Sequence, residues 1–411
     1  MVCNKNECRG CMACLAVCNE NAIHKEKDNE GFLYPVIDDI KCKKCKKCLN
    51  ICPVLNPVFN EKRNIKKCYA AYSRNIQIQR DSSSGGLFSE IASSILEQNG
   101  VIFGAAFTDS FNVCHIDIDT NDALHLLRGS KYVQSDINNC YLRIKQYLEN
   151  NRKVLFSGTP CQIAGLYAYL NKEFDLLYTI DIVCHGTPSP LIFFEYKNWL
   201  EKKYGKMISF SFRDKKYSWK RFNIKAVMEQ KTYYGTWEED PYMRGFLRDY
   251  YLRMSCHSCK YAVPHRLADI TLADFWGYKS RRGKFRDQDN GMSMVLINTI
   301  HGECLFDSTK RRIHYIETPL SEAINGNRAL SSCFPPSKLR DKFWNDFQVY
   351  GFEKLIEKYL YPEKINIVRM ILYKYGKDSI MYFFVFRISQ VFSCLRNSIK
   401  KSFYTWVNYE D

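Results

Sequence analysis

Short apolar runs alternate with longer segments of helical periodicity between residues 66 and 205. The apolar, strand-like runs cover residues 67–73, 101–107, 153–158 and 176–184. The helix-like segments that follow these runs cover residues 87–100, 138–151, 162–173 and 191–205. Such alternation is typical of βαβ units, so it predicts an α/β domain with a mainly parallel sheet.

The chain changes character on both sides of this stretch. Residues 206–300 contain short strand-like runs, which predict a mixed α+β half. Residues 1–60 are rich in cysteine and contain an internal repeat of 34 residues that takes Cys8 onto Cys42 and Cys18 onto Cys52. We therefore predict an α+β multidomain protein with a separate module over 1–60, body regions over 66–160 and 161–345, and a helical tail over 346–411.

Within this tail, the segment 379–401 is rich in aromatic and apolar residues, and four of its polar positions share one narrow stripe: Arg387, Gln390, Asn397 and Lys401. The pattern predicts an amphipathic helix that is interrupted too early to span a membrane. We expect this helix to pack against the body of the protein, with a weak contact to a membrane surface as the alternative.

Cysteine usage points to metal or redox chemistry. The 411-residue chain contains 19 cysteines, and it begins without a basic, apolar and small-residue signal sequence. We therefore expect a cytoplasmic protein whose thiols stay free of disulfides. The net charge of +16 is spread along the chain without a nucleic-acid recognition motif, so nucleic acid is not the expected partner. The charge instead favours an acidic redox partner or an anionic substrate.

Two cysteine runs carry the most specific signal. They are Cys8-x2-Cys11-x2-Cys14-x3-Cys18 and Cys42-x2-Cys45-x2-Cys48-x3-Cys52. Three thiolates of each run converge on one cubane and the fourth reaches the other cluster, which gives the sets Cys8, Cys11, Cys14, Cys52 and Cys42, Cys45, Cys48, Cys18. Structural zinc is the alternative, although zinc sites usually separate two cysteine pairs by a longer spacer.

This module resembles bacterial two-cluster [4Fe–4S] ferredoxins over residues 1–60, with Asn19 where that pattern has proline. Its second loop contains Lys43, Lys44, Lys46 and Lys47. Positive charge there is expected to raise the potential of the cluster, and a solvated basic face is the other interpretation. Cys3 precedes the pattern and has no assigned role.

A third group of cysteines lies in the body. Thr159, Pro160 and Gln162 predict a capped helix start, which places Cys161 in the first turn where the helix dipole favours a thiolate. Cys184 ends the next strand-like run, so both thiols are expected at the carboxyl ends of parallel strands. Together with the pair Cys256 and Cys259 they provide four ligands for a third cluster, although zinc or a redox dithiol is compatible with the same residues.

Several segments resemble the beta-subunit family of coenzyme F420-reducing hydrogenases and dehydrogenases. They are SSSGGLFSEIA, FSGTPCQIAGL, DIVCHGTPSP, FRDKKYSW, SCHSCKYAVPHRLADITLADFWG and GMSMVLINT, which occur in order between residues 66 and 345. The resemblance implies an iron–sulfur flavoprotein that holds FAD near a [4Fe–4S] cluster ligated by Cys161, Cys184, Cys256 and Cys259. The family also contains reductases of chlorophyll-type tetrapyrroles, so the resemblance leaves the substrate open.

A flavin site is expected where residues 82–86 precede a helix. Hydroxyls, glycines and free N–H groups at Ser84, Gly85 and Gly86 suit a pyrophosphate, although an ordinary serine cap has the same sequence. Basic residues that would neutralise phosphate or a reduced flavin are Lys131, Arg213 and Lys215, with a solvated strand end as the alternative for the last two.

His185 and His257 adjoin cluster cysteines and are the candidate proton relays. Asp269 and Asp274 are expected to serve as turn or cap residues. The isolated cysteines, which are interpreted as packing residues, are Cys68, Cys114, Cys140, Cys304, Cys333 and Cys394.

The sequence as a whole predicts an oxidoreductase that passes electrons between two ferredoxin-type clusters, a body cluster, FAD and a hydride-type acceptor such as coenzyme F420. The expected partner is a soluble carrier such as ferredoxin, or a redox subunit. The alternatives are an electron-transfer subunit of a larger complex, a reductase of a tetrapyrrole or sugar-linked intermediate, and a zinc-containing binding protein. No residue identifies a deazaflavin or the direction of electron flow.

Overall fold

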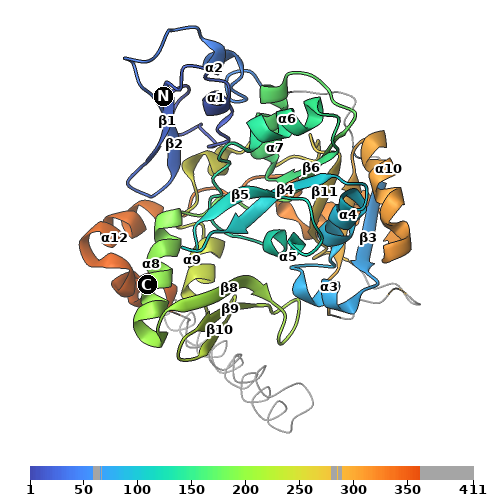
Figure 1. Cartoon of the computed structure of the whole chain (residues 1–411). Coiled ribbons are helices and arrows are strands. Elements are labelled where there is room, and N and C mark those ends of the chain that lie inside the picture. Colours follow the sequence, from blue (N-terminus) through green and yellow to red (C-terminus); the bar gives the residue numbers. More distant parts are fainter. Residues whose placement is uncertain (59–64, 66, 279–284, 286–288, 362–411) are drawn as a thin grey trace, which may run out of the picture. The chain divides into compact units, whose positions relative to one another are not determined.

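The computed structural model describes residues 1–58, 65, 67–278, 285 and 289–361 (Figure 1). Residues Met1–Leu355 form one compact unit and Ile356–Asp411 a second. The predicted helix within 379–401 and most of the link after the N-terminal module lie outside the described residues. Among the helices that are described, none combines the length and the apolar character needed to cross a membrane.

The N-terminal module repeats one backbone pattern twice. Helix α1 (Ala13–Ala16) and helix α2 (Lys47–Asn50) each follow a residue in the left-handed region, Met12 with φ 59° and Lys46 with φ 61°. Between them, β1 (Ile23–Lys27) and β2 (Leu33–Ile37) form an antiparallel hairpin. The 34-residue repeat of the sequence is therefore also a repeat of the structure.

The body is built on one eight-stranded sheet with the order β13-β3-β12-β11-β7-β6-β4-β5. In chain order its strands are β3 (Lys67–Ser73), β4 (Val101–Phe107), β5 (Val113–Ile118), β6 (Val154–Gly158), β7 (Leu177–Ile182), β11 (Ile270–Asp274), β12 (Ser293–Ile297) and β13 (Ile313–Glu317). A separate antiparallel sheet has the order β10-β9-β8, from β8 (Met207–Asp214), β9 (Asn223–Met228) and β10 (Thr232–Thr236).

The mixed α+β class is confirmed, but the parallel part of the sheet is narrower than predicted. Only the neighbours β4, β6, β7 and β11 run parallel, and both flanks are antiparallel. Parallel neighbours need a crossover, which α6 (Cys140–Glu149) and α7 (Pro160–Leu170) provide, whereas β5 returns directly from β4. The carboxyl ends of β6 and β7 therefore lie side by side, as predicted.

Helices cover both faces of the sheet (Figure 1). On one face, α4 (Leu87–Leu96) and α10 (Ile300–Thr309) pack on one apolar cluster. On the other, α6 and α7 pack on a second cluster that also contains Met12 and Ala13 of the N-terminal module. The module and the body thus share a core.

The remaining helices are α3 (Ile76–Asp81), α5 (Leu124–Leu127), α8 (Pro190–Tyr204), α9 (Pro241–Leu247), α11 (Leu320–Gly326) and α12 (Arg340–Leu355). Short 3-10 turns cover Met254–Ser258, Lys310–Arg312 and Arg328–Leu330. Helix α12 runs through residue 346, where the sequence predicts the start of the tail. The unit Met1–Leu355 therefore includes the first residues assigned to that tail.

Candidate redox centres and cavity

The first centre is a group of thiols in the N-terminal module. Cys52, from the second run, lies near Cys8, because the neighbouring Cys3 thiol lowers the pKa of each to about 6. Burial raises the pKa of Cys14, and the neighbouring thiols of the same group raise it further. Cys3, which had no assigned role, therefore lies beside this group.

The second thiol group takes its fourth member from the first run. Burial raises the pKa of Cys48, and Cys18 and Cys42 are the neighbouring thiols that add to this shift. The first group is mostly buried, whereas Cys45 of the second is exposed. The structure thus places the cysteines in two groups, one inner and one outer.

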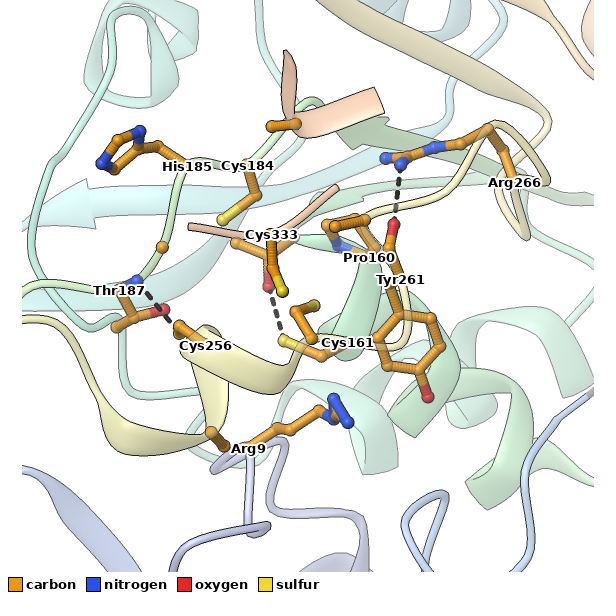
Figure 2. Close-up of a pocket in the computed structure, with 16 residues that line it drawn as sticks. Arg9, Pro160, Cys161, Cys184, His185, Thr187, Cys256, Tyr261, Arg266 and Cys333 are labelled. Atoms are coloured by element: carbon orange, nitrogen blue, oxygen red, sulfur yellow. Dashed lines mark hydrogen bonds between the residues drawn. The ribbon is translucent and has the colours of Figure 1, made fainter. Parts of the chain in front are cut away.

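The third centre is a pocket in the body (Figure 2). Its lining includes Cys161, Cys184, Cys256 and Cys259. Cys161 is the second residue of α7, where the Thr159 N–H donates to Gln162 Oε1 at 2.8 Å and completes the predicted capping box. The strand ends and the 3-10 turn Met254–Ser258 therefore bring the four predicted thiols to one place.

Cys333 also lines this pocket, and its thiol donates to the His257 carbonyl at 3.1 Å. The sequence marks it only as an isolated packing residue. Cys333 lies far along the chain from the other four cysteines, so no local sequence pattern marks it as a pocket residue.

Burial is the largest cause of the pKa shifts of three of the four predicted ligand thiols. Burial raises the pKa of Cys161 and Cys184, and raises that of Cys256 to about 11. The sequence predicts the opposite for Cys161, because a helix N-terminus favours a thiolate.

The four predicted thiols that line this pocket match the ligand number of either a tetrahedral zinc or a [4Fe–4S] cubane. One tetrahedral zinc holds each sulfur at about 2.3 Å from a common point. Within the described part of the chain, no three Cys, His, Asp or Glu side chains are grouped closely enough to hold one metal ion. A cubane would take each of the four thiolates at a different corner.

The N-terminal module is attached at this pocket. Arg9, next to Cys8, lines the pocket with its guanidinium 5.1 Å from the Tyr261 ring, and its buried Nη1 has no hydrogen-bond partner. From the body, Arg253 donates through Nε to the Cys8 carbonyl at 2.8 Å and through Nη1 to the Leu33 carbonyl at 3.1 Å. The inner thiol group is thereby fixed next to the body pocket.

A larger cavity of about 760 Å³ adjoins the pocket, and Cys161, Cys184 and His185 line both. Its walls also include residues 82–84 before α4, the segment 127–135 and the rings of Phe222, Trp237 and Trp276. The volume lies within the range of cofactor sites, about 300–1,000 Å³. The cavity and the thiol pocket therefore share part of their walls.

Of the six residues predicted to bind a flavin, four line this cavity: Ser84, Gly86, Lys131 and Arg213. Gly85 faces the sheet, since a Cβ there would lie 2.5 Å from the Ala71 carbonyl, and its N–H donates to Ser293 Oγ. Lys215 donates to the carbonyls of Gln79, Ser84 and Asn290 at 2.7, 2.5 and 2.8 Å. These two residues therefore shape the loop before α4 and do not border the cavity.

Arg213 is held by an acidic partner. Its Nη1 and Nη2 donate to Asp274 at 2.7 and 3.0 Å, and Nη2 also donates to the Ser83 carbonyl. The guanidinium lies 3.9 Å from the centre of the Phe222 ring. Asp274, predicted as a turn residue, is thus the counter-ion of a cavity arginine, whereas Asp269 is a structural acceptor for Thr179.

Only one of the two predicted proton relays borders the cavity. His185 does so and pairs through Nε2 with Asp249 at 2.7 Å. His257 is absent from the lining and contacts the Phe334 carbonyl through Nδ1. His115, which the sequence analysis missed, also lines the cavity, and burial lowers its pKa to about 4.

The cavity wall contains further charge that the sequence analysis missed. Arg128 lines it and donates to Ser89 Oγ, and Ser83 Oγ accepts from the N–H of Ser130. Burial lowers the pKa of Lys131 to about 7. Arg128 directly precedes the segment GSKYVQSD that contains Lys131, and the sequence pattern points only to the lysine.

Comparison with known proteins finds a family match in two parts of the chain. Residues 151–322 match the family described as the C terminus of the coenzyme F420 hydrogenase/dehydrogenase beta subunit, and residues 7–56 match the 4Fe–4S dicluster domain. No curated protein is detectably similar. A chain of the F420-reducing [NiFe] hydrogenase complex from Methanosarcina barkeri matches with TM-score 0.41 and 16% sequence identity, over 73% of this chain and 94% of that chain.

Proposed function

Because residues 151–322 belong to the coenzyme F420 hydrogenase/dehydrogenase beta-subunit family and residues 7–56 form a 4Fe–4S dicluster domain, we propose that this oxidoreductase is an iron–sulfur flavoprotein. It exchanges electrons between its ferredoxin-type module and a hydride-type acceptor such as coenzyme F420. The observation that carries the proposal is the contiguity of the inner thiol group, the body pocket and the 760 Å³ cavity.

The ligand sets follow from the thiol groups. The inner cluster of the module takes Cys8, Cys11, Cys14 and Cys52, and the outer cluster takes Cys42, Cys45, Cys48 and Cys18. A third cluster in the body takes Cys161, Cys184, Cys256 and Cys259. The contact between Gly165 of α7 and Cys11 supports this arrangement, because it holds the inner loop within one helical turn of Cys161.

The cavity is the proposed FAD site. Ser83, Ser84 and Gly86 just before α4, with Arg128 and Lys131, offer hydroxyls, N–H groups and positive charge to the pyrophosphate. The end of the cavity lined by Cys161 and Cys184 suits the flavin ring, since that end adjoins the body pocket. When bound, FAD supplies the conversion between one-electron and two-electron chemistry.

His185 is the proposed proton donor and acceptor at the ring end of the cavity. Asp249 pairs with its Nε2 and thereby fixes the orientation of the imidazole. Asp249 itself has φ 60°, a left-handed conformation that is uncommon for residues other than glycine. His257 has no part in this role, because it does not border the cavity.

The outer thiol group favours a second candidate function. Its exposed loop is a natural contact for another redox protein, so the chain also suits the role of an electron-transfer subunit in a larger complex. Turnover of a deazaflavin, pyridine nucleotide or viologen by the purified chain separates the two candidates. Activity that appears only when a partner is added identifies the subunit role.

The direct test is anaerobic quantitation of iron, acid-labile sulfide and flavin on one sample. Three cubanes and one flavin give about twelve irons, about twelve sulfides and one FAD per chain. About eight irons without flavin would reject the body cluster and the flavin site while leaving the ferredoxin-type module. A colourless sample with zinc and no sulfide would reject the proposal as a whole.

A further inference from the structure

The two loops of the N-terminal module share one backbone but lie in opposite environments. The 34-residue repeat aligns Gly10 with Lys44 and Met12 with Lys46. All four residues are left-handed, with φ 67°, 54°, 59° and 61° respectively. The loops are therefore structural copies, and differences between their side chains report on what each loop contacts.

The inner loop, which contains Gly10 and Met12, packs against the body. Met12 and Ala13 are 3% and 0% exposed and belong to the core formed with α6 and α7. A Cβ on Gly10 would lie 2.8 Å from Gln134 Nε2, and one on Gly165 would lie 2.9 Å from Cys11 Cβ. This loop thus packs its thiol group directly against the next component.

The outer loop presents the same shape to solvent. Lys44, Lys46 and Lys47 are exposed, and so is Cys45, the counterpart of Cys11. Two further lysines border them, and their acidic partners are Glu20 for Lys43 and Asp38 for Lys41. Ile40, an apolar side chain at the start of the loop, is 98% exposed.

Two of these lysines occupy positions that disfavour them. A residue other than glycine in the left-handed region costs of the order of 1–3 kcal/mol. Lys44 stands where the inner copy has Gly10, so the positive charge is present despite backbone strain. Within the described residues, neither Lys44 nor Lys46 has an acidic side chain within salt-bridge distance.

From this pairing of loops we infer that the outer loop, defined by Ile40 and the five lysines 41, 43, 44, 46 and 47, docks an acidic one-electron carrier protein. The inference rests on the proposed function and names its partner class. An exposed cluster ligand calls for a redox protein, and electron-transfer contacts are small and steered by charge. An anionic membrane or a nucleic acid would also attract the lysines. Neither exchanges electrons, so neither accounts for an exposed cluster ligand, Cys45, at the centre of the surface.

The test measures association with a defined probe, an acidic plant-type [2Fe–2S] ferredoxin, on an optical biosensor at several salt concentrations. The double variant Lys44→Glu with Lys46→Glu is expected to lower the association rate constant roughly tenfold or more at low salt. Near 1 M salt the difference should vanish, because the Debye length falls to about 3 Å. A basic cytochrome c, used as the opposite probe, should associate faster with this variant than with the wild type.

Two further variants separate docking from folding and from net charge. Lys44→Gly with Lys46→Met copies the inner loop, relieves strain at residue 44 and should still slow association, by less than the glutamate pair. Lys203→Glu with Lys206→Glu changes the net charge equally on exposed residues of α8 and its C-terminal end, and should leave the rate within about twofold. Iron and sulfide content must match wild type in all three.

An equal loss of rate in the loop pair and the control pair would overturn the inference, and so would no loss in either. Loss of binding to phosphatidylserine vesicles in the loop variants, with ferredoxin association unchanged, would assign the surface to a membrane and also overturn it. Failure of the proposed function looks different. It shows as missing iron or flavin in the wild-type protein, whatever the association rates are.

Discussion

Gly165 allows the inner cysteine loop to contact α7, and its replacement by alanine tests that packing. An alanine Cβ at this position would lie 2.8 Å from Tyr141 Oη, 2.9 Å from Cys11 Cβ and 3.2 Å from Cys11 Sγ. Carbon atoms in ordinary contact lie about 3.5–4.0 Å apart, so each neighbour must move by roughly 0.5–1 Å. Both neighbours are constrained: Tyr141 is 1% exposed and donates to the Gln162 carbonyl at 2.8 Å.

The sign of the stability change is decided by comparing the opposing contributions. Overpacking costs about 1–3 kcal/mol, and loss of the tyrosine hydrogen bond adds about 1 kcal/mol. Replacing glycine by alanine inside a helix stabilises the folded state by about 1 kcal/mol, because alanine has the higher helix propensity. Gly165→Ala should therefore lower the free energy of unfolding by about 1–3 kcal/mol and disturb the inner cluster before the others.

Anaerobic thermal and urea unfolding of the loaded protein measure the stability change, and electron paramagnetic resonance reports on the inner cluster. Gly104→Ala in β4 is the matched control, because its Cβ would lie 3.4 Å from the nearest atom, Leu127 Cδ1. That variant should be as stable as wild type or up to about 1 kcal/mol more stable. If Gly165→Ala is also stabilised and its cluster signals are unchanged, α7 does not pack on the cysteine loop and the inferred proximity is wrong.

Three other perturbations test separate parts of the site. Cys259→Ala should remove about four of twelve irons and leave the module signals intact, whereas Cys304→Ala, at an exposed cysteine, should remove none; equal iron in both would exclude a body cluster. Because burial lowers the pKa of Lys131 to about 7 and a bound phosphate would raise it, FAD should bind most tightly below pH 7 and lose affinity as the pH rises through the bound-state pKa. Fluorescence titration should show this slope in wild type and its absence in Lys131→Met; identical profiles would remove Lys131 from the site. Arg253→Met should lower the free energy of unfolding by about 3 kcal/mol, because two backbone carbonyls lose their buried cationic donor. It should also speed amide hydrogen exchange in residues 1–58. The control Arg143→Met, which breaks an exposed ion pair, should leave amide exchange unchanged.

Structural features that depend on residues close together in the sequence could be predicted. The ligand spacing of the cysteine runs is local, because three thiolates of one loop must reach one cubane. The helix start at Cys161 was predictable because the capping residues Thr159 and Gln162 lie within four positions of each other. The class of the fold followed from periodicity, which reports on burial of each segment against a sheet.

Features that depend on contacts between distant segments could not be predicted. Gly85 was expected at the cavity but faces β3 and β12, and its hydrogen-bond partner Ser293 lies 208 residues away. Cys333 and Arg9 border the thiol pocket from opposite ends of the chain, in segments without any ligand spacing of their own. The direction in which a loop side chain points is set by its tertiary neighbours, about which periodicity is silent.

Helix α7 relates two of the proposed centres to each other. Cys161 and Gly165 are four residues apart, so they lie on one face of the helix, about 6 Å apart along its axis. Cys161 lines the body pocket, and Gly165 accepts the Cys11 loop of the inner thiol group. A single rigid element therefore sets the separation of the two centres, which a flexible linker between domains could not do. This shared helix also explains why the module, predicted as separate, forms one compact unit with the body.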